Sequence, residues 1–163
     1  MLNMAEGFFK KNWPRSVSWF IAAIFSSIFF SFLHGANPNM NKLAALNILL
    51  AGLMLAYPFW KTGRLYLSIG IHAGWNYAQG GIFGFAVSGN AIRGNLISTQ
   101  LIGPDLWTGG SFGPEGGLLG TLGIIIVFML CYLGYALLSD MHRPNTYDQE
   151  QKKAPSEPRL ELD

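Results

Sequence analysis

The chain has 163 residues, of which 50% are hydrophobic, 14% are aromatic and only 12% are charged, and its formal net charge is +2. Soluble domains carry roughly twice that charged fraction, so the composition excludes an ordinary soluble domain. The basic residues flank apolar runs instead of forming a stripe, which argues against a nucleic-acid partner, and the single Cys131 leaves no disulfide framework.

The charged residues leave four long uncharged segments, each long enough to cross a bilayer core of about 30 Å, which takes about 20 residues. Backbone groups in hydrocarbon must be hydrogen-bonded internally, so these segments are predicted to be helices rather than strands. The predicted fold is therefore an all-α polytopic membrane bundle of about four transmembrane helices. We place these helices near residues 17–33, 43–60, 65–87 and 117–138, and expect Pro58 to sharpen the end of the second.

The positions of the basic residues predict the orientation of the chain. Of its 11 Lys and Arg residues, all but Lys42 and Arg93 fall on the side of the membrane that would hold both termini. We therefore predict an integral protein of the cell's inner membrane, with the bilayer as a partner and both termini in the cytoplasm. It would have a cytoplasmic segment at 1–16, a transmembrane core at 17–138 and a disordered cytoplasmic tail at 139–163.

The connection between the third and fourth predicted helices, residues 88–116, is long and rich in Gly and Pro. Loops of this length usually have a function or are mobile. A lid or re-entrant segment and a plain extracytoplasmic loop are both compatible with this sequence.

Two of the three histidines lie in apolar segments, and an ionisable side chain in a transmembrane helix suggests a functional site. His34 ends the first predicted helix, four residues after Phe30. His72 lies within the third, and Asn76 follows it at the i+4 position, on the same helical face. His142 falls in the tail and is given no role.

The chemistry of this group has more than one interpretation. Two imidazoles can bind zinc, which in a catalytic site takes a third ligand that is often a carboxylate. Alternatively they could hold a water for a carboxylate base, with the Asn76 amide donating to a developing oxyanion. Both routes need an acid in the membrane, and none of the predicted helices contains one. A third interpretation is that these side chains only form hydrogen bonds between helices.

The pair Phe30-x-x-x-His34 and His72-x-x-x-Asn76 resembles the second and third motifs of the CAAX protease and bacteriocin-processing family of intramembrane proteases. The resemblance runs over roughly residues 1–87. It implies a fold of about eight helices, of which this chain would supply part, and a site in which His34, His72 and Asn76 are catalytic and Phe30 supports them. It also implies a peptide or protein substrate, such as a prenylated peptide or a bacteriocin precursor, and either a zinc bound by His34 and His72 or a glutamate-activated water.

The first motif of that family, E-E-x-x-x-R, has no counterpart in the 163 residues. We therefore expect an N-terminally truncated fragment that is inactive as an endopeptidase. The alternatives are a natural short form acting as a non-catalytic membrane protein, in bacteriocin immunity or scaffolding, and a haem or metal-ion carrier that uses the histidine pair.

Overall fold

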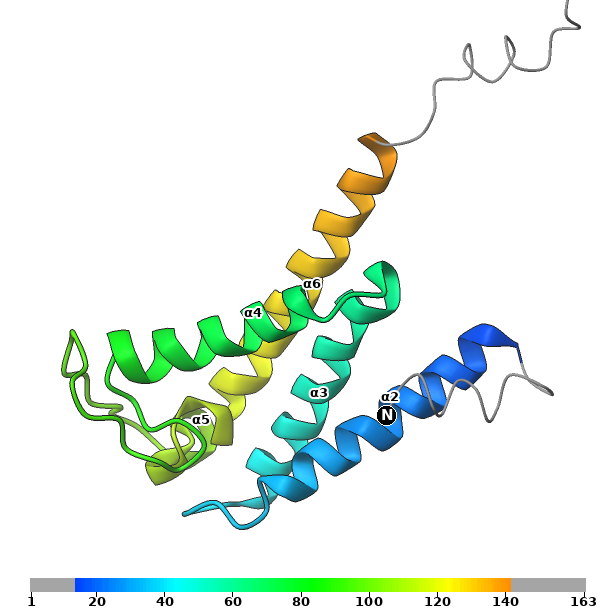
Figure 1. Ribbon diagram of the computed structural model, residues 1–163. Helices are drawn as coiled ribbons and strands as arrows, with labels where there is room; N and C mark the ends of the chain where they lie inside the picture. The colour runs from blue at the N-terminus through cyan, green and yellow to red at the C-terminus, as the bar shows by residue number, and fades with distance from the viewer. Residues whose placement is uncertain (1–13, 142–163) are drawn as a thin grey trace, which may run out of the picture. The chain divides into compact units, whose positions relative to one another are not determined.

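The computed structural model describes residues 14–141, and the regular structure within them is helical (Figure 1). This confirms the predicted all-α class. Most of the predicted segments 1–16 and 139–163, and His142, lie outside the described residues. The elements are the long helices α2 (Arg15–Leu33), α3 (Lys42–Thr62), α4 (Tyr66–Asn76) and α6 (Leu118–Met141), the π-helical turn η1 (Tyr77–Ile82), and the short helices α5 (Asp105–Thr108), η2 (Gly110–Phe112) and η3 (Pro114–Gly116).

Three helices in the described part of the chain are long and apolar enough to cross a membrane, namely Ser16–Leu33, Lys42–Thr62 and Leu118–Leu138. They coincide with the first, second and fourth predicted transmembrane segments. The chain is an integral membrane protein, in agreement with its composition. Many large apolar side chains on these helices are exposed in the isolated chain, as expected for surfaces that face lipid.

The third predicted segment, 65–87, is helical only from Tyr66 to Ile82, so its predicted end is wrong by five residues. The helix stops because Gly84 adopts a left-handed φ of 71° and a later loop segment pairs with the end of the helix. The amides of Leu96 and Ile97 donate to the carbonyls of Gly81 and Ile82, at 2.9 and 2.8 Å. Those bonds satisfy carbonyls that have no partner inside the helix.

Small side chains let α2 and α3 approach each other closely, side by side in Figure 1. A Cβ added to Gly52 would lie 2.9 Å from the Cβ of Ser27, which is itself buried. One turn further along α2, the Ser31 hydroxyl donates to the Ala45 carbonyl at 2.9 Å. This combination of small residues and interhelical hydrogen bonds is typical of packing between membrane helices.

Pro58 was expected to sharpen the end of this helix, but the residue at which α3 stops is Gly63. The helix continues to Thr62 and ends where Gly63 takes a left-handed φ of 67°, with its amide donating to the Phe59 carbonyl at 2.7 Å. Proline removes one amide donor, and this close to a helix end the backbone tolerates that loss because glycine provides the stop. The Thr62 hydroxyl also donates to the Pro58 carbonyl at 2.7 Å.

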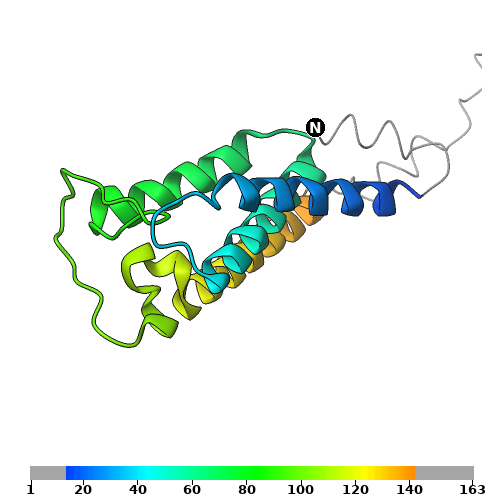
Figure 2. The ribbon, with the colours of Figure 1, turned by 90° about the horizontal axis from the view of Figure 1, so that it is seen from below.

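The last part of the 88–116 connection, from Thr108 onward, packs onto the helices, whereas most of the side chains at 91–107 are exposed. Its Phe112 has no exposed surface and forms an apolar cluster with Ala44 and Ile48 of α3. Figure 2, seen from below, shows the same segment returning past the ends of α2 and α4 toward the start of α6. The chain divides into two units, residues 1–131 and 132–163. Everything that forms the site described below belongs to the first unit.

Candidate active site

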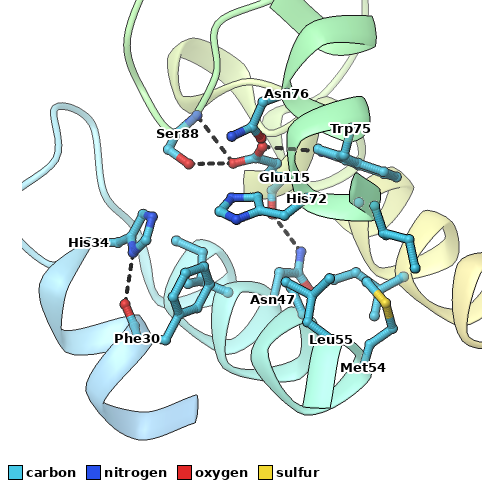
Figure 3. Close-up of a pocket in the computed structure, with 15 residues that line it drawn as sticks. Phe30, His34, Asn47, Met54, Leu55, His72, Trp75, Asn76, Ser88 and Glu115 are labelled. Atoms are coloured by element: carbon cyan, nitrogen blue, oxygen red, sulfur yellow. Dashed lines mark hydrogen bonds between the residues drawn. The ribbon is translucent and has the colours of Figure 1, made fainter. Parts of the chain in front are cut away.

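A pocket in the first unit is formed by the end of α2, the middle of α3, α4, the 88–116 connection and the start of α6 (Figure 3). Phe30, His34, His72 and Asn76, all singled out from the sequence, line it. Apolar side chains of α3 and α4 make up one part of its wall, and polar side chains the other. The polar side chains that line the pocket are His34, Asn47, His72, Asn76, Ser88 and Glu115.

Phe30 lies between the two histidines. Its ring centroid is 4.5 Å from that of His34 and 5.5 Å from that of His72, the second contact being edge-on. Phe30 and His34 are four residues apart at the end of α2, so they lie on one face of that helix. The structure thus brings imidazoles from two different helices against one aromatic ring.

The hydrogen bond made by His34 determines which of its nitrogens is protonated. Its Nδ1 lies 2.8 Å from the Phe30 carbonyl oxygen. A carbonyl oxygen only accepts, so Nδ1 must donate, and in the neutral imidazole this leaves Nε2 without a proton. His34 therefore offers a lone pair at Nε2, either to a proton or to a ligand.

His72 and Asn76 both line the pocket from α4, as their i, i+4 spacing requires. Figure 3 draws no hydrogen bond from either side chain to the other residues around the pocket. The Asn76 amide is directly followed by the π-helical turn Tyr77–Ile82. Turns of this kind are rare and are frequent at functional sites. The catalytic roles of His34, His72 and Asn76 stay predictions.

Glu115 is the main residue that the sequence analysis missed. The predicted helices contain no acid, but the loop before α6 carries this carboxylate into the pocket from the short helix η3. It accepts a hydrogen bond from Trp75 Nε1 at 3.2 Å, and from the amide and the hydroxyl of Ser88 at 3.2 and 2.6 Å. The sequence signal that could have identified Glu115 is an acid in a Gly-rich stretch directly before a predicted transmembrane helix.

Asn47 holds the backbone around Glu115 against α3. This asparagine is 1% exposed, and its amide donates to the carbonyls of Glu115 and Gly117 at 2.7 and 2.9 Å. Its own oxygen accepts from the hydroxyl of Thr121 in α6 at 2.8 Å. The side chain is therefore fully bonded to the segment that connects η3 to α6.

A catalytic zinc site takes three protein ligands. Within residues 14–141, no three His, Cys, Asp or Glu side chains lie together in a way that could hold a metal ion. Glu115 lines the same pocket as His34 and His72, but its carboxylate is bonded to Trp75 and Ser88. The described residues do not make up a complete zinc site, and the zinc predicted at the two histidines stays a prediction.

Comparison with known proteins gives one match. Residues 4–78 match the model of a family described as type II CAAX prenyl endopeptidase Rce1-like. The matched segment contains Phe30, His34, His72 and Asn76, whereas Glu115 lies beyond it. No curated protein and no solved structure matches the chain.

Proposed function

We propose that the chain is a member of the CAAX protease and bacteriocin-processing family, in line with the match of residues 4–78 to the Rce1-like model, and that its pocket is the hydrolytic site of an intramembrane endopeptidase. The observation that carries this proposal is the meeting of His34 and His72 on the two sides of Phe30, next to Asn76. Side chains that can hold a water and stabilise negative charge are thereby collected inside a largely apolar helical bundle.

In the proposed reaction a water oxygen attacks the carbonyl carbon of a peptide bond, and a basic group in the pocket takes the proton that the water loses. The unprotonated Nε2 of His34 is suited to hold or accept that proton. The Asn76 amide donates to the oxyanion that forms on the carbonyl. The C–N bond then breaks, and the departing amine receives the proton that the basic group took from the water. No step of this scheme passes through a metal ion.

The substrate we propose is a peptide or protein that reaches the site from the membrane. The pocket has an apolar side formed by α3 and α4 beside its polar side, so it can accept an apolar group next to the bond that is cut. A prenylated C-terminal peptide has this character, and a bacteriocin leader is the alternative substrate.

We expect the 163-residue chain by itself to have no endopeptidase activity. The E-E-x-x-x-R motif does not occur in it, and the carboxylate of Glu115 already accepts three hydrogen bonds. General acid–base help contributes about 10²–10⁴-fold to such a reaction, so a site in which no free carboxylate assists the histidines should be slow by about that factor.

The test compares this chain with a chimera in which an E-E-x-x-x-R-bearing segment of a family member precedes Met1. Both are reconstituted in liposomes with fluorogenic peptides, prenylated and unprenylated. We expect cleavage by the chimera alone, abolished by His34→Ala and by His72→Ala and unchanged by His142→Ala. Cleavage that survives His72→Ala would overturn the proposal, and the histidines would then serve helix packing.

Orientation is tested separately, since it rests on the Lys and Arg positions and on the third predicted segment crossing the membrane together with the three long helices. We propose the inner membrane, with both termini in the cytoplasm. A reporter fused after Leu138 should read as cytoplasmic, and one inserted at Gly109 should read as external. The reversed pattern would contradict this orientation without affecting the proposed chemistry.

A further inference from the structure

We infer that Glu115 is a positioning residue of the pocket, whose carboxylate fixes the rotation of α4 and so the direction in which His72 and Asn76 face. This inference rests on the proposed function, because the side chains that it positions are those assigned to hydrolysis. Glu115 lies outside the segment that matches the family model, and its role follows from its contacts alone.

The first step is that the backbone of Glu115 is itself fixed. The buried amide of Asn47 donates to the Glu115 carbonyl, and the neighbouring Gly117 carbonyl receives the second N–H of the same amide. A Cβ added to Gly120 would lie 2.8 Å from the Glu115 Cα, so the first turn of α6 also lies directly against it. The carboxylate therefore projects from a rigid point between α3 and α6.

The second step is that this carboxylate joins α4 to the loop at Ser88. One oxygen accepts the indole N–H of Trp75, on α4, and the other accepts the amide and hydroxyl of Ser88, in the loop. Hydrogen bonds to an ionised acceptor are about twice as strong as neutral ones. Figure 3 shows the carboxylate between Trp75, Asn76 and Ser88, on the same side of α4 as His72.

The third step is that Trp75 is held from its other side as well. A Cβ added to Gly123 of α6 would lie 2.5 Å from Cη2 of the indole, so the ring packs directly on the backbone there. Trp75 precedes Asn76 by one residue and follows His72 by three. With its ring and its N–H both fixed, α4 cannot rotate without breaking one of these contacts, and His72 and Asn76 are carried with it.

The three bonds also explain why this residue is an acid. A carboxylate has only acceptor positions, and three N–H or O–H groups converge on this one. Glutamine would place an N–H₂ group where an acceptor is needed, and would lose at least one of the bonds. The same three bonds occupy most of the lone pairs of the carboxylate, which suits it for holding other groups and not for taking a proton from water.

The first experiment needs no proteolysis and uses the 163-residue chain in nanodiscs, with ¹⁵N-labelled Trp and ¹³C-labelled His. Trp75→Phe identifies the Trp75 indole N–H resonance and His72→Gln that of the His72 ring. We expect Glu115→Gln to move both the Trp75 and the His72 resonances. Asp105→Asn, which neutralises another acid of the same loop, should move neither.

If Glu115→Gln leaves the His72 resonance in place, the inference is overturned, even where the Trp75 resonance moves, because the acid would then hold the indole without orienting the site. Ser88→Ala is the second variant in case Glu115→Gln does not fold. Ser88→Ala removes one hydrogen-bond donor and retains the charge of Glu115, so it should move the Trp75 and His72 resonances by less than Glu115→Gln does.

The second experiment measures kcat and KM in the chimera described above. We expect Glu115→Gln to lower kcat about 10²-fold with little change in KM, because a displacement of about 1 Å in the reacting groups costs that much. The double variant Trp75→Phe, Glu115→Gln should lose no more than the more damaging single variant, since both remove one interaction. An additive loss would contradict a shared role.

The two experiments separate the two proposals. A chimera that never cleaves, together with a His72 resonance that responds to Glu115→Gln, contradicts the proposed function and leaves the positioning role standing. A chimera that cleaves equally well with and without Glu115→Gln contradicts the positioning role and leaves the proposed function standing.

Discussion

Where α2 meets α3, small side chains let two helices approach closely, whereas α4 is joined to the 88–116 loop through the carboxylate of Glu115. At the first contact Gly52 faces Ser27, and the gap leaves no room for one further carbon atom. At the second, Trp75 and Ser88 donate to a common acceptor. The difference implies that the first contact is sensitive to side-chain volume, and the second to the number of hydrogen-bond partners.

The largest loss of stability is expected for a substitution of Asn47, whose side chain in α3 holds the backbone of Glu115 at the second contact. Asn47→Ala removes three hydrogen bonds and leaves the Glu115 carbonyl without this donor, whereas the Gly117 carbonyl still accepts from the amides of Gly120 and Thr121. A buried group without a partner costs about 1–3 kcal/mol, so we expect the free energy of unfolding in mixed micelles to fall by about 3 kcal/mol. The exposed Asn90→Ala is the control and should change it little. An equal effect of both substitutions would show that the burial of Asn47 contributes nothing.

A volume change at the first contact should come next. Gly52→Ala places a Cβ 2.9 Å from the Cβ of Ser27 and 3.0 Å from its Cα, so α2 and α3 must separate. Overpacking costs about 1–3 kcal/mol, and we expect the free energy of unfolding to fall by about 2 kcal/mol. The matched control is Gly70→Ala in α4, where nothing lies within 4 Å and a helix interior gains from alanine. If Gly52→Ala is as well tolerated as Gly70→Ala, the two helices are not in close contact.

A smaller loss of stability is expected when one hydrogen-bond donor is removed from the second contact with little change in side-chain volume. Ser88→Ala deletes the 2.6 Å bond to Glu115 and leaves the Ser88 amide bond to the same carboxylate. We expect a loss of about 1.5 kcal/mol, the lower end of the range for bonds to charged groups. In the Glu115→Gln background the same substitution should cost less, and a double-mutant cycle in micelles measures the difference.

The smallest effect should come from the polar interaction within the first contact. Ser31→Ala removes the hydroxyl that donates to the Ala45 carbonyl, at a site where the helices stay in contact through small residues. Interhelical hydrogen bonds in membranes contribute about 0.6 kcal/mol on average, and we expect a loss of that size. A loss greater than that of Ser88→Ala would reverse the distinction between the two contacts.

Much of the fold could be predicted from the sequence because the constraint was local. A charge-free segment of sufficient length must be helical in a bilayer, whatever its neighbours are, and this applies to α2, α3 and α6. The ends of the helices were harder to predict from the sequence. Pro58 was expected to sharpen the end of α3, but Gly63 ends the helix. The segment 83–87 leaves the helix because a later loop segment pairs with the carbonyls before it.

The two histidines and Asn76 could be selected from the sequence for the same local reason. An ionisable residue in an apolar segment and an i, i+4 spacing can both be recognised from neighbouring residues alone. Glu115 and Asn47 were not found. One lies in a loop 39 positions after Asn76, by subtraction of their numbers, and the other is an amide in an apolar helix. Their importance arises from contacts that join segments far apart in the chain.

The sequence by itself determined that the chain is a helical membrane protein with two histidines and an asparagine in or next to apolar helices, because hydrophobicity and helical periodicity act over neighbouring residues. Only the tertiary structure decided that His34 and His72 meet at Phe30 and that a carboxylate from the loop reaches the same pocket. The reason is that the fold of the 88–116 segment depends on the Asn47 amide and on the burial of Phe112. No local sequence pattern predicts either of these contacts.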